Sequence, residues 1–145
     1  MKQILKFNSP KGHYTADACV VWCFDERFGE CLERFIKGER FVRSDNVVVG
    51  GGAKSLASKN LSEREFLLGQ IKISLKLHGT KTVVLMLHSD CGAYGGLAGF
   101  EGDKTRERSS LETELRSAKS FLKENLPASV KIKLVFADFE GVYEV

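Results

Sequence analysis

The sequence predicts an α/β fold of three layers, in which a mostly parallel central sheet of four strands lies between helices. Short apolar runs typical of buried strands alternate with segments of helical periodicity. Such alternation implies right-handed crossovers and hence parallel strands. No repeat, low-complexity tract or linker interrupts the chain, so residues 1–145 are expected to form one domain.

Four segments are expected to be strands. Ala18–Cys23 is a nearly continuous apolar run, as in a strand buried on both faces of a parallel sheet. Val47–Val49 and Thr82–Leu87 are interpreted in the same way, and Lys131–Ala137 is the expected fourth strand. Gly141–Val145 is expected to return beside the fourth strand as a short fifth edge strand.

Helices are expected between these strands. The first is indicated by apolar residues at helical spacing, ahead of the stop signal Gly38: Phe28, Cys31, Leu32, Phe35 and Ile36. The second is expected to start at a capping box formed by Ser62 and Glu65 and to end near His78, before Gly79.

A third helix is predicted by an apolar stripe that ends shortly before Pro127, made of Leu111, Leu115, Ala118 and Leu122. Ser109 and Glu112 have the capping-box spacing and are expected to start this helix.

Charge and composition exclude several classes of protein. The net charge is only +3, and the 22 basic residues are interleaved with 19 acidic ones, so no nucleic-acid-binding surface is predicted. No apolar run approaches the roughly 20 residues of a membrane span, and no signal-peptide pattern is present. A cytoplasmic location is therefore expected, where the four cysteines would be thiols or metal ligands.

Three metal-ligand side chains are expected to meet at one edge of the sheet. Cys23 ends the first predicted strand, His88 follows the third, and Cys91 comes three residues later. In open parallel sheets, ligands bind beyond the carboxyl ends of the strands. Two thiolates and an imidazole suit Zn²⁺, and three protein ligands leave a fourth position for water, which indicates a catalytic site.

A charged pair follows the first ligand. Asp25 and Arg27 lie in the turn that leaves the first predicted strand, where the arginine can hold the carboxylate through two hydrogen bonds. The Asp25 carboxylate can either complete the zinc shell or accept a hydrogen bond from the nucleophile. These two uses exclude each other.

The motifs Cys23-Phe24-Asp25-Glu26-Arg27 and His88-Ser89-Asp90-Cys91-Gly92 resemble the Cys-x-Asp-x-Arg and His-x-x-Cys-Gly motifs of the β-carbonic anhydrases. The resemblance covers the chain from about Ala18 to Gly92 and is to a compact, divergent branch of that family. In place of the family's Arg-Asn-Ala-Gly type of stretch, this chain has Gly50-Gly51-Gly52-Ala53.

The resemblance implies a β-carbonic-anhydrase-like fold and a zinc-dependent lyase. Its substrate would be carbon dioxide, hydrated reversibly to bicarbonate by a zinc-bound hydroxide, on a homodimer or a dimer of dimers. Cys23, His88 and Cys91 would bind the zinc ion, and Asp25 with Arg27 would form the catalytic dyad.

Other functions share these residues. The chain is also consistent with a non-catalytic zinc-binding protein in which Asp25 stays on the metal, or with a zinc hydrolase of carbonyl sulfide or carbon disulfide. A metal-free hydrolase would instead use Cys91 or Cys23 as a nucleophile activated by His88.

Several neighbouring residues have more than one interpretation. Asp90 either orients His88 or caps a following helix, and the three glycines at 50–52 are expected to let the backbone pass close to the site. Residues 94–99 form either a gating loop or a simple turn. Cys19 and Cys31 are expected to be core residues.

Overall fold

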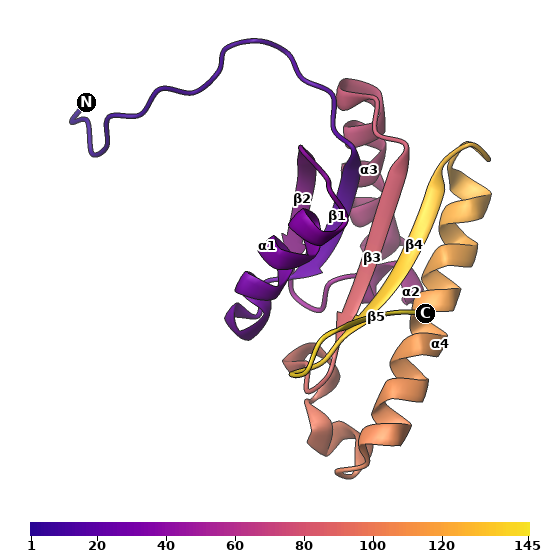
Figure 1. Ribbon diagram of the computed structural model, residues 1–145. Coiled ribbons are helices and arrows are strands. Elements are labelled where there is room, and N and C mark those ends of the chain that lie inside the picture. The colour runs from indigo at the N-terminus through magenta and orange to yellow at the C-terminus, as the bar shows by residue number, and fades with distance from the viewer.

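The computed structural model describes residues 1–145 and contains a five-stranded sheet with the order β2-β1-β3-β4-β5 (Figure 1). The strands are β1 (Ala18–Cys23), β2 (Ser44–Val49), β3 (Thr82–His88), β4 (Lys131–Ala137) and β5 (Val142–Glu144). The first four are parallel, and β5 pairs antiparallel with β4. The predicted α/β architecture is confirmed, including the short edge strand.

Helices cover both faces of the sheet. They are α1 (Gly29–Gly38), α2 (Lys54–Ala57), α3 (Leu61–His78) and α4 (Lys104–Asn125), with 3₁₀ turns η1 (Glu26–Phe28), η2 (Gly92–Tyr94) and η3 (Leu97–Phe100). Residues 1–17 contain no helix and no strand, and most of this segment extends away from the sheet in Figure 1. None of the helices combines the length and apolar character that crossing a bilayer requires.

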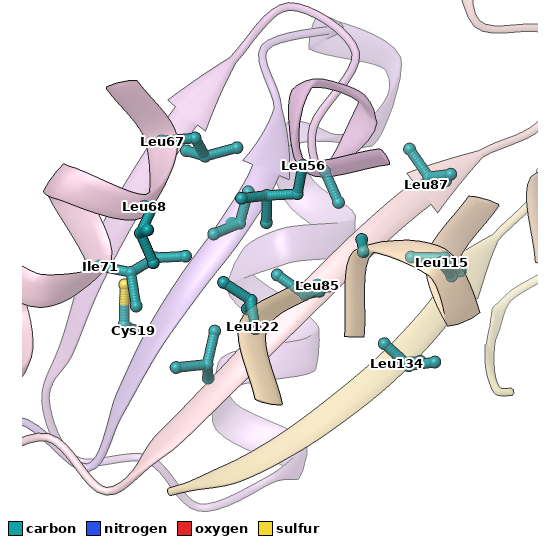
Figure 2. Close-up of a cluster of buried hydrophobic side chains, with 14 of the residues drawn as sticks. Cys19, Leu56, Leu67, Leu68, Ile71, Leu85, Leu87, Leu115, Leu122 and Leu134 are labelled. Atoms are coloured by element: carbon teal, nitrogen blue, oxygen red, sulfur yellow. The ribbon is translucent and has the colours of Figure 1, made fainter. Parts of the chain in front are cut away.

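The core lies in two clusters, one on each face of the sheet. The larger one joins β1, β3 and β4 to α2, α3 and α4, and its centre holds Leu56, Ile71, Leu85, Leu115 and Leu122 (Figure 2). The smaller one packs the opposite face, including Trp22 and Met86, against η1 and α1. Because β1 and β3 are covered on both faces, their sequences are continuous apolar runs.

Strand β2 differs from its prediction. Val47–Val49 was expected to be buried on both faces, but β2 is an edge strand and Val48 keeps 46% of its surface exposed. An edge strand has only one neighbour, so part of its surface stays open to solvent. The apolar character of the three valines therefore did not reveal their position in the sheet.

The start of α3 also differs from its prediction. Its N-cap is Asn60, not Ser62: the Asn60 side-chain oxygen accepts the Ser62 backbone N–H at 3.1 Å. Gly79 ends the helix in the left-handed conformation, as expected.

Helix α4 begins at Lys104, and its N-cap lies six residues earlier than the predicted Ser109. Its N-cap is Asp103, whose carboxylate accepts the N–H groups of Thr105 and Arg106. Ser109 lies inside the helix and donates its hydroxyl hydrogen to the Thr105 carbonyl at 2.9 Å. The capping-box prediction was wrong because the apolar stripe was taken to start at Leu111, one turn too late.

The strand order creates one switch point. From β1 the chain moves outward to β2 and then crosses to the other side of β1 to form β3. The connections at the carboxyl ends of β1 and β3 therefore leave in opposite directions and open a crevice between them. Cys23 and His88 are the last residues of these two strands.

Two glycines should respond in opposite ways to alanine. Gly52 has φ +56°, and a Cβ there would lie 2.4 Å from the Met86 carbonyl oxygen. We expect Gly52→Ala to lower the free energy of unfolding by at least about 2 kcal/mol. Gly69, inside α3, has nothing within 4 Å of its Cβ position, so Gly69→Ala should raise that free energy by about 0.5–1 kcal/mol. Urea denaturation measures both, and equal shifts would contradict the packing described here.

Candidate metal centre

Three ligand side chains converge at the switch point. Cys23 ends β1, His88 ends β3 and Cys91 precedes η2, and their ligand atoms all lie within 4.8 Å of one another. The three residues are between 1% and 4% exposed. A tetrahedral ion with zinc–sulfur bonds of about 2.3 Å places its two sulfurs roughly 3.8 Å apart, so these side chains can close on one zinc ion with little movement.

The His88 ring is oriented for binding a metal. Its Nδ1 lies 2.8 Å from the Ser89 carbonyl oxygen, which can only accept, so Nδ1 carries the proton. Its Nε2 is buried and has no hydrogen-bond partner. An unpartnered buried nitrogen is costly, and a metal ion between the sulfurs would satisfy its lone pair. The residues therefore fit the zinc ion that their chemistry suggests.

The two thiols differ in protonation. The Cys91 thiol donates to Cys23, and with a contribution from His88 it lowers the pKa of Cys23 to about 4. The same contact, together with burial, raises the pKa of Cys91. Burial disfavours the His88 imidazolium, but the nearby Cys23 sulfur and the Ser89 carbonyl favour it more strongly and raise the His88 pKa. A metal would displace the remaining thiol proton, because only thiolates bind it.

The glycines after β2 bring the backbone close to this centre, as expected. A Cβ on Gly51 would lie 2.9 Å from the Ala93 Cβ, and one on Gly52 would lie 3.4 Å from the Cys23 nitrogen. The Gly51 backbone N–H also helps to lower the pKa of Cys23. Side chains at these two positions would push the β2–α2 connection away from the ligands.

The segment 94–99 is folded between η2 and η3 and is fastened at both sides. The Tyr94 hydroxyl donates to Glu114 on α4 at 2.9 Å. Lys54, on α2, donates to the Ala93 carbonyl, and its ammonium lies 4.8 Å from the centre of the Tyr94 ring. These contacts hold the start of the segment, beside Cys91, and favour the turn of the two interpretations.

Asp25 and Arg27 form the expected pair with two hydrogen bonds. Arg27 Nη2 donates to Asp25 Oδ2 at 2.7 Å, and Arg27 Nε donates to Oδ1 at 3.0 Å. The Arg27 backbone N–H also donates to Oδ1, so Asp25 caps η1. These bonds hold the pKa of Asp25 at about 2. The carboxylate is thus charged near neutral pH, and its side chain remains 20% exposed.

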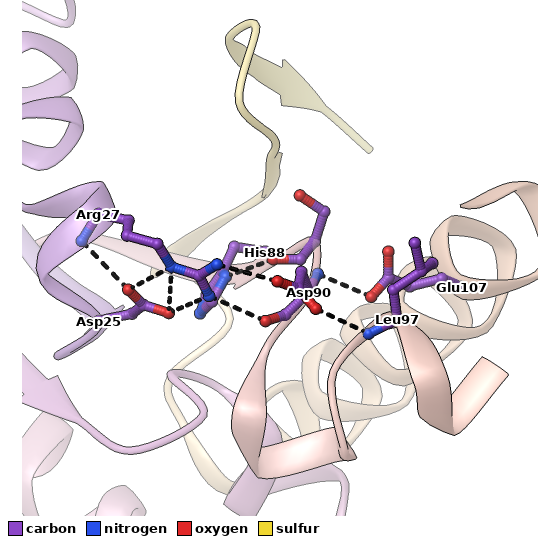
Figure 3. A network of polar contacts seen from close by, with 7 residues as sticks. Asp25, Arg27, His88, Asp90, Leu97 and Glu107 are labelled. Atoms are coloured by element: carbon purple, nitrogen blue, oxygen red, sulfur yellow. Dashed lines mark hydrogen bonds and ion pairs between the residues drawn. The ribbon is translucent and has the colours of Figure 1, made fainter. Parts of the chain in front are cut away.

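Asp90 does not orient His88. Its carboxylate accepts the N–H of Leu97, the first residue of η3, at 2.9 Å, and also accepts Arg27 Nη1 at 2.9 Å (Figure 3). The Leu97 hydrogen bond and then Arg27 lower the pKa of Asp90. Asp90 therefore caps the following turn η3, which agrees with the second of the two interpretations. Its contact with Arg27 was not predicted from the sequence.

Sequence reasoning missed Glu107. This carboxylate is only 2% exposed, and its Oε1 accepts the Asp90 backbone N–H at 2.7 Å. A signal was present, because Glu107 lies four residues before Leu111 and so falls on the apolar stripe of α4. An acidic residue on a buried stripe indicates a buried partner.

The remaining cysteines and His78 lie away from the metal centre. Cys19 is buried in the larger core, Cys31 lies on α1, and all four cysteines are free. The pKa of Cys19 is raised by burial to about 11, which suits an inert core thiol. His78 pairs with Asp45 of β2 at 2.7 Å, and its ring stacks on Tyr14.

A sheet with helices on both faces and a Cys₂His group at its switch point defines an α/β protein with a candidate metal centre. Residues 14–144 match the family described as "Putative carbonic anhydrase", and the chain belongs to that family. It is also 26% identical to an uncharacterized protein of Rickettsia bellii, over 99% of this chain and 92% of that protein.

Solved carbonic anhydrases share the fold. The chain is similar to the Streptococcus mutans carbonic anhydrase, with a TM-score of 0.64 and 19% identity over 92% of this chain and 83% of that one. The Trichomonas vaginalis β-carbonic anhydrase has a TM-score of 0.64 and 15% identity, over 96% and 87%. A carbon disulfide hydrolase has a TM-score of 0.51 and 13% identity, over 90% and 79%. The β-carbonic-anhydrase-like fold is confirmed.

Metal binding can be tested with the four cysteines. We expect the purified chain to hold about one zinc ion, and Cys23→Ala, Cys91→Ala or His88→Ala to lower that content at least about tenfold, since each removes one of only three protein ligands. Cys31→Ala and Cys19→Ala are the matched controls and should keep the metal. Elemental analysis measures this, and equal zinc content in all five variants would contradict the assignment.

Proposed function

We propose that this protein is a zinc-dependent lyase that hydrates carbon dioxide reversibly to bicarbonate. The proposal is carried by one observation: a buried Cys₂His group, which offers three of the four ligands that zinc takes, lies beside a carboxylate that Arg27 keeps ionised. Family membership supports the same activity.

Zinc held by Cys23, His88 and Cys91 would act as a Lewis acid and lower the pKa of a water molecule at its fourth position. Asp25, which stays ionised, can only accept hydrogen bonds. We assign it the role of receiving one hydrogen from the attacking oxygen, so that a lone pair faces the substrate carbon. Arg27 keeps Asp25 in that position through the contacts of Nε and Nη2.

The surroundings suit a small apolar substrate that becomes an anion. The Phe28 ring packs 4.4 Å from the His88 ring, and Phe139 lies 5.4 Å from Phe28. The Arg27 guanidinium lies 5.3 Å from the Phe139 ring centre and is 45% exposed. The rings give the ligand group an apolar border, while the guanidinium provides positive charge near the bicarbonate product.

Other uses of the same residues make different predictions. The low pKa of Cys23 beside His88 also suits a metal-free thiolate nucleophile, and purification without zinc would favour that hydrolase. A carbon disulfide hydrolase shares this fold, so carbon disulfide and carbonyl sulfide belong in the substrate panel. Zinc without turnover would indicate the non-catalytic protein in which Asp25 occupies the metal.

Carbon dioxide hydration tests the proposal directly. We expect the zinc-loaded chain to accelerate hydration in a stopped-flow assay. Asp25→Asn should lower kcat/KM about 10- to 100-fold, because an uncharged amide accepts a hydrogen bond from the attacking oxygen less strongly than a carboxylate does. Glu30→Gln is the matched control. Glu30 pairs with Arg34 on the surface of α1, and this change should leave kcat/KM unchanged.

The same assay should show a rate that rises from pH 6 to pH 9. Two thiolates formally neutralise the zinc charge, so water should be acidified less than in a site of three neutral histidines, where its pKa is about 7. A flat profile over this range, or full activity in Asp25→Asn, would contradict the proposed chemistry.

We further propose that the chain acts as one cytoplasmic domain and assembles as a homodimer or a dimer of dimers. Free cysteines support the location. The open edge strand β2 with its exposed Val48, and the exposed apolar side chains Phe66 and Ile73 on α3, support assembly. We expect light scattering coupled to gel filtration to give at least twice the 16.1 kDa chain mass, and a strictly monomeric elution would overturn assembly.

A further inference from the structure

We propose that Asp90 is a positioning residue for this site, which holds the Arg27 guanidinium independently of Asp25 and so keeps Asp25 off the metal. This inference rests on the proposed function in one respect only: it assumes that the fourth position of the Cys₂His group is used. It starts from the two carboxylates that share Arg27 (Figure 3).

The guanidinium of Arg27 serves both carboxylates without competition. Nε and one hydrogen of Nη2 face Asp25, at 3.0 Å and 2.7 Å. Nη1 donates to Asp90 Oδ2 at 2.9 Å, and Nη2 also donates to the Asp90 carbonyl at 3.0 Å. A guanidinium has five N–H groups in a rigid plane, so each carboxylate takes its own hydrogens. Arg27 is therefore fastened on two sides.

Asp90 is itself held by two hydrogen bonds besides its contacts with Arg27. Its backbone has φ +53°, and its N–H donates to the buried carboxylate of Glu107 at 2.7 Å. Its Oδ1 accepts the Leu97 N–H, and a Cβ on Gly96 would lie only 2.8 Å from that oxygen. The position of Arg27 is thus tied through Asp90 to helix α4.

This anchoring matters because Asp25 has two incompatible positions. Asp25 either keeps its bonds to Arg27 or turns onto the metal. Exposed ion pairs are usually weak because both side chains lose freedom on pairing. With Asp90 and its supports already holding Arg27 in place, Asp25 meets a preorganised partner. Removal of the Asp90 carboxylate should therefore shift Asp25 toward the metal.

The contact can be tested on metal-free protein. Asparagine tolerates positive φ, so Asp90→Asn should fold while losing the charge that faces Nη1. We expect the side-chain N–H groups of Arg27 to exchange with solvent about three to ten times faster in Asp90→Asn, measured by nitrogen-15 NMR. Arg34 is the internal reference, and Glu30→Gln, which alters Arg34 alone, is the control variant. An unchanged Arg27 exchange rate would overturn the anchoring.

The consequence for the fourth position can be tested with cobalt(II) in place of zinc and azide as the probe. We expect Asp90→Asn to weaken azide binding about three- to tenfold, because Asp25 then competes for the metal. In an Asp25→Ala background the same change should have no effect. Equal weakening in both backgrounds would show that Asp90 acts on the fold instead, and would overturn the inference.

Two further results separate this inference from the proposed function. A chain that binds cobalt and azide as described but hydrates no carbon dioxide would refute the activity and support the inference. A chain that binds no cobalt would refute the metal centre, and the exchange rates of Arg27 would then decide the anchoring. If Asp90→Asn does not fold, the Asp25→Ala chain replaces it: with Asp90 still bonded to Nη1 and Nη2, the side-chain N–H groups of Arg27 should exchange more slowly than those of Arg34, and equal exchange would overturn the inference.

Discussion

The parallel pairing of β1 with β3 is the constraint on which the rest of this structure depends. The register places Val21 beside Leu85, so the two strands end together and bring Cys23 and His88 to one point. Both strands are covered by core clusters on both faces. A slip of one residue in this register would turn every side chain of the shifted strand to the other face of the sheet. Cys23 and His88 would then no longer meet at one point.

The polar groups around that point differ in how deeply they are buried. The three candidate ligands are almost fully buried, and the His88 Nε2 among them has no hydrogen-bond partner, which is costly in a buried group. The charged pair Asp25 and Arg27 stays partly exposed, where water can reach it. Between these layers Asp90 contacts both the arginine and, through Glu107, the long helix α4. The loop that carries Cys91 is therefore supported from both sides of the crevice.

Local patterns predicted most of the fold, and their failures share a cause. The bounds of β1 follow from a nearly continuous apolar run, which is typical of strands buried on both faces of a parallel sheet. A similar apolar run led to a wrong prediction for the burial of β2. The position of a strand in the sheet cannot be derived from the sequence of that strand alone. Both helix starts were misjudged because capping boxes are short and occur by chance at other positions, whereas Asn60 and Asp103 are set by where each helix packs.

The sequence by itself determined the chemical groups that this protein carries: two cysteine thiols, one imidazole, and an aspartate two residues from an arginine, each at or within a few residues of the end of an apolar run. Spacing can indicate such groups because ligand types and strand periodicity are local properties. Only the tertiary structure decided that Asp90 faces Arg27 and that Glu107 faces Asp90. These contacts join β1, β3 and α4, and which surfaces meet depends on the packing of the whole sheet and its helices.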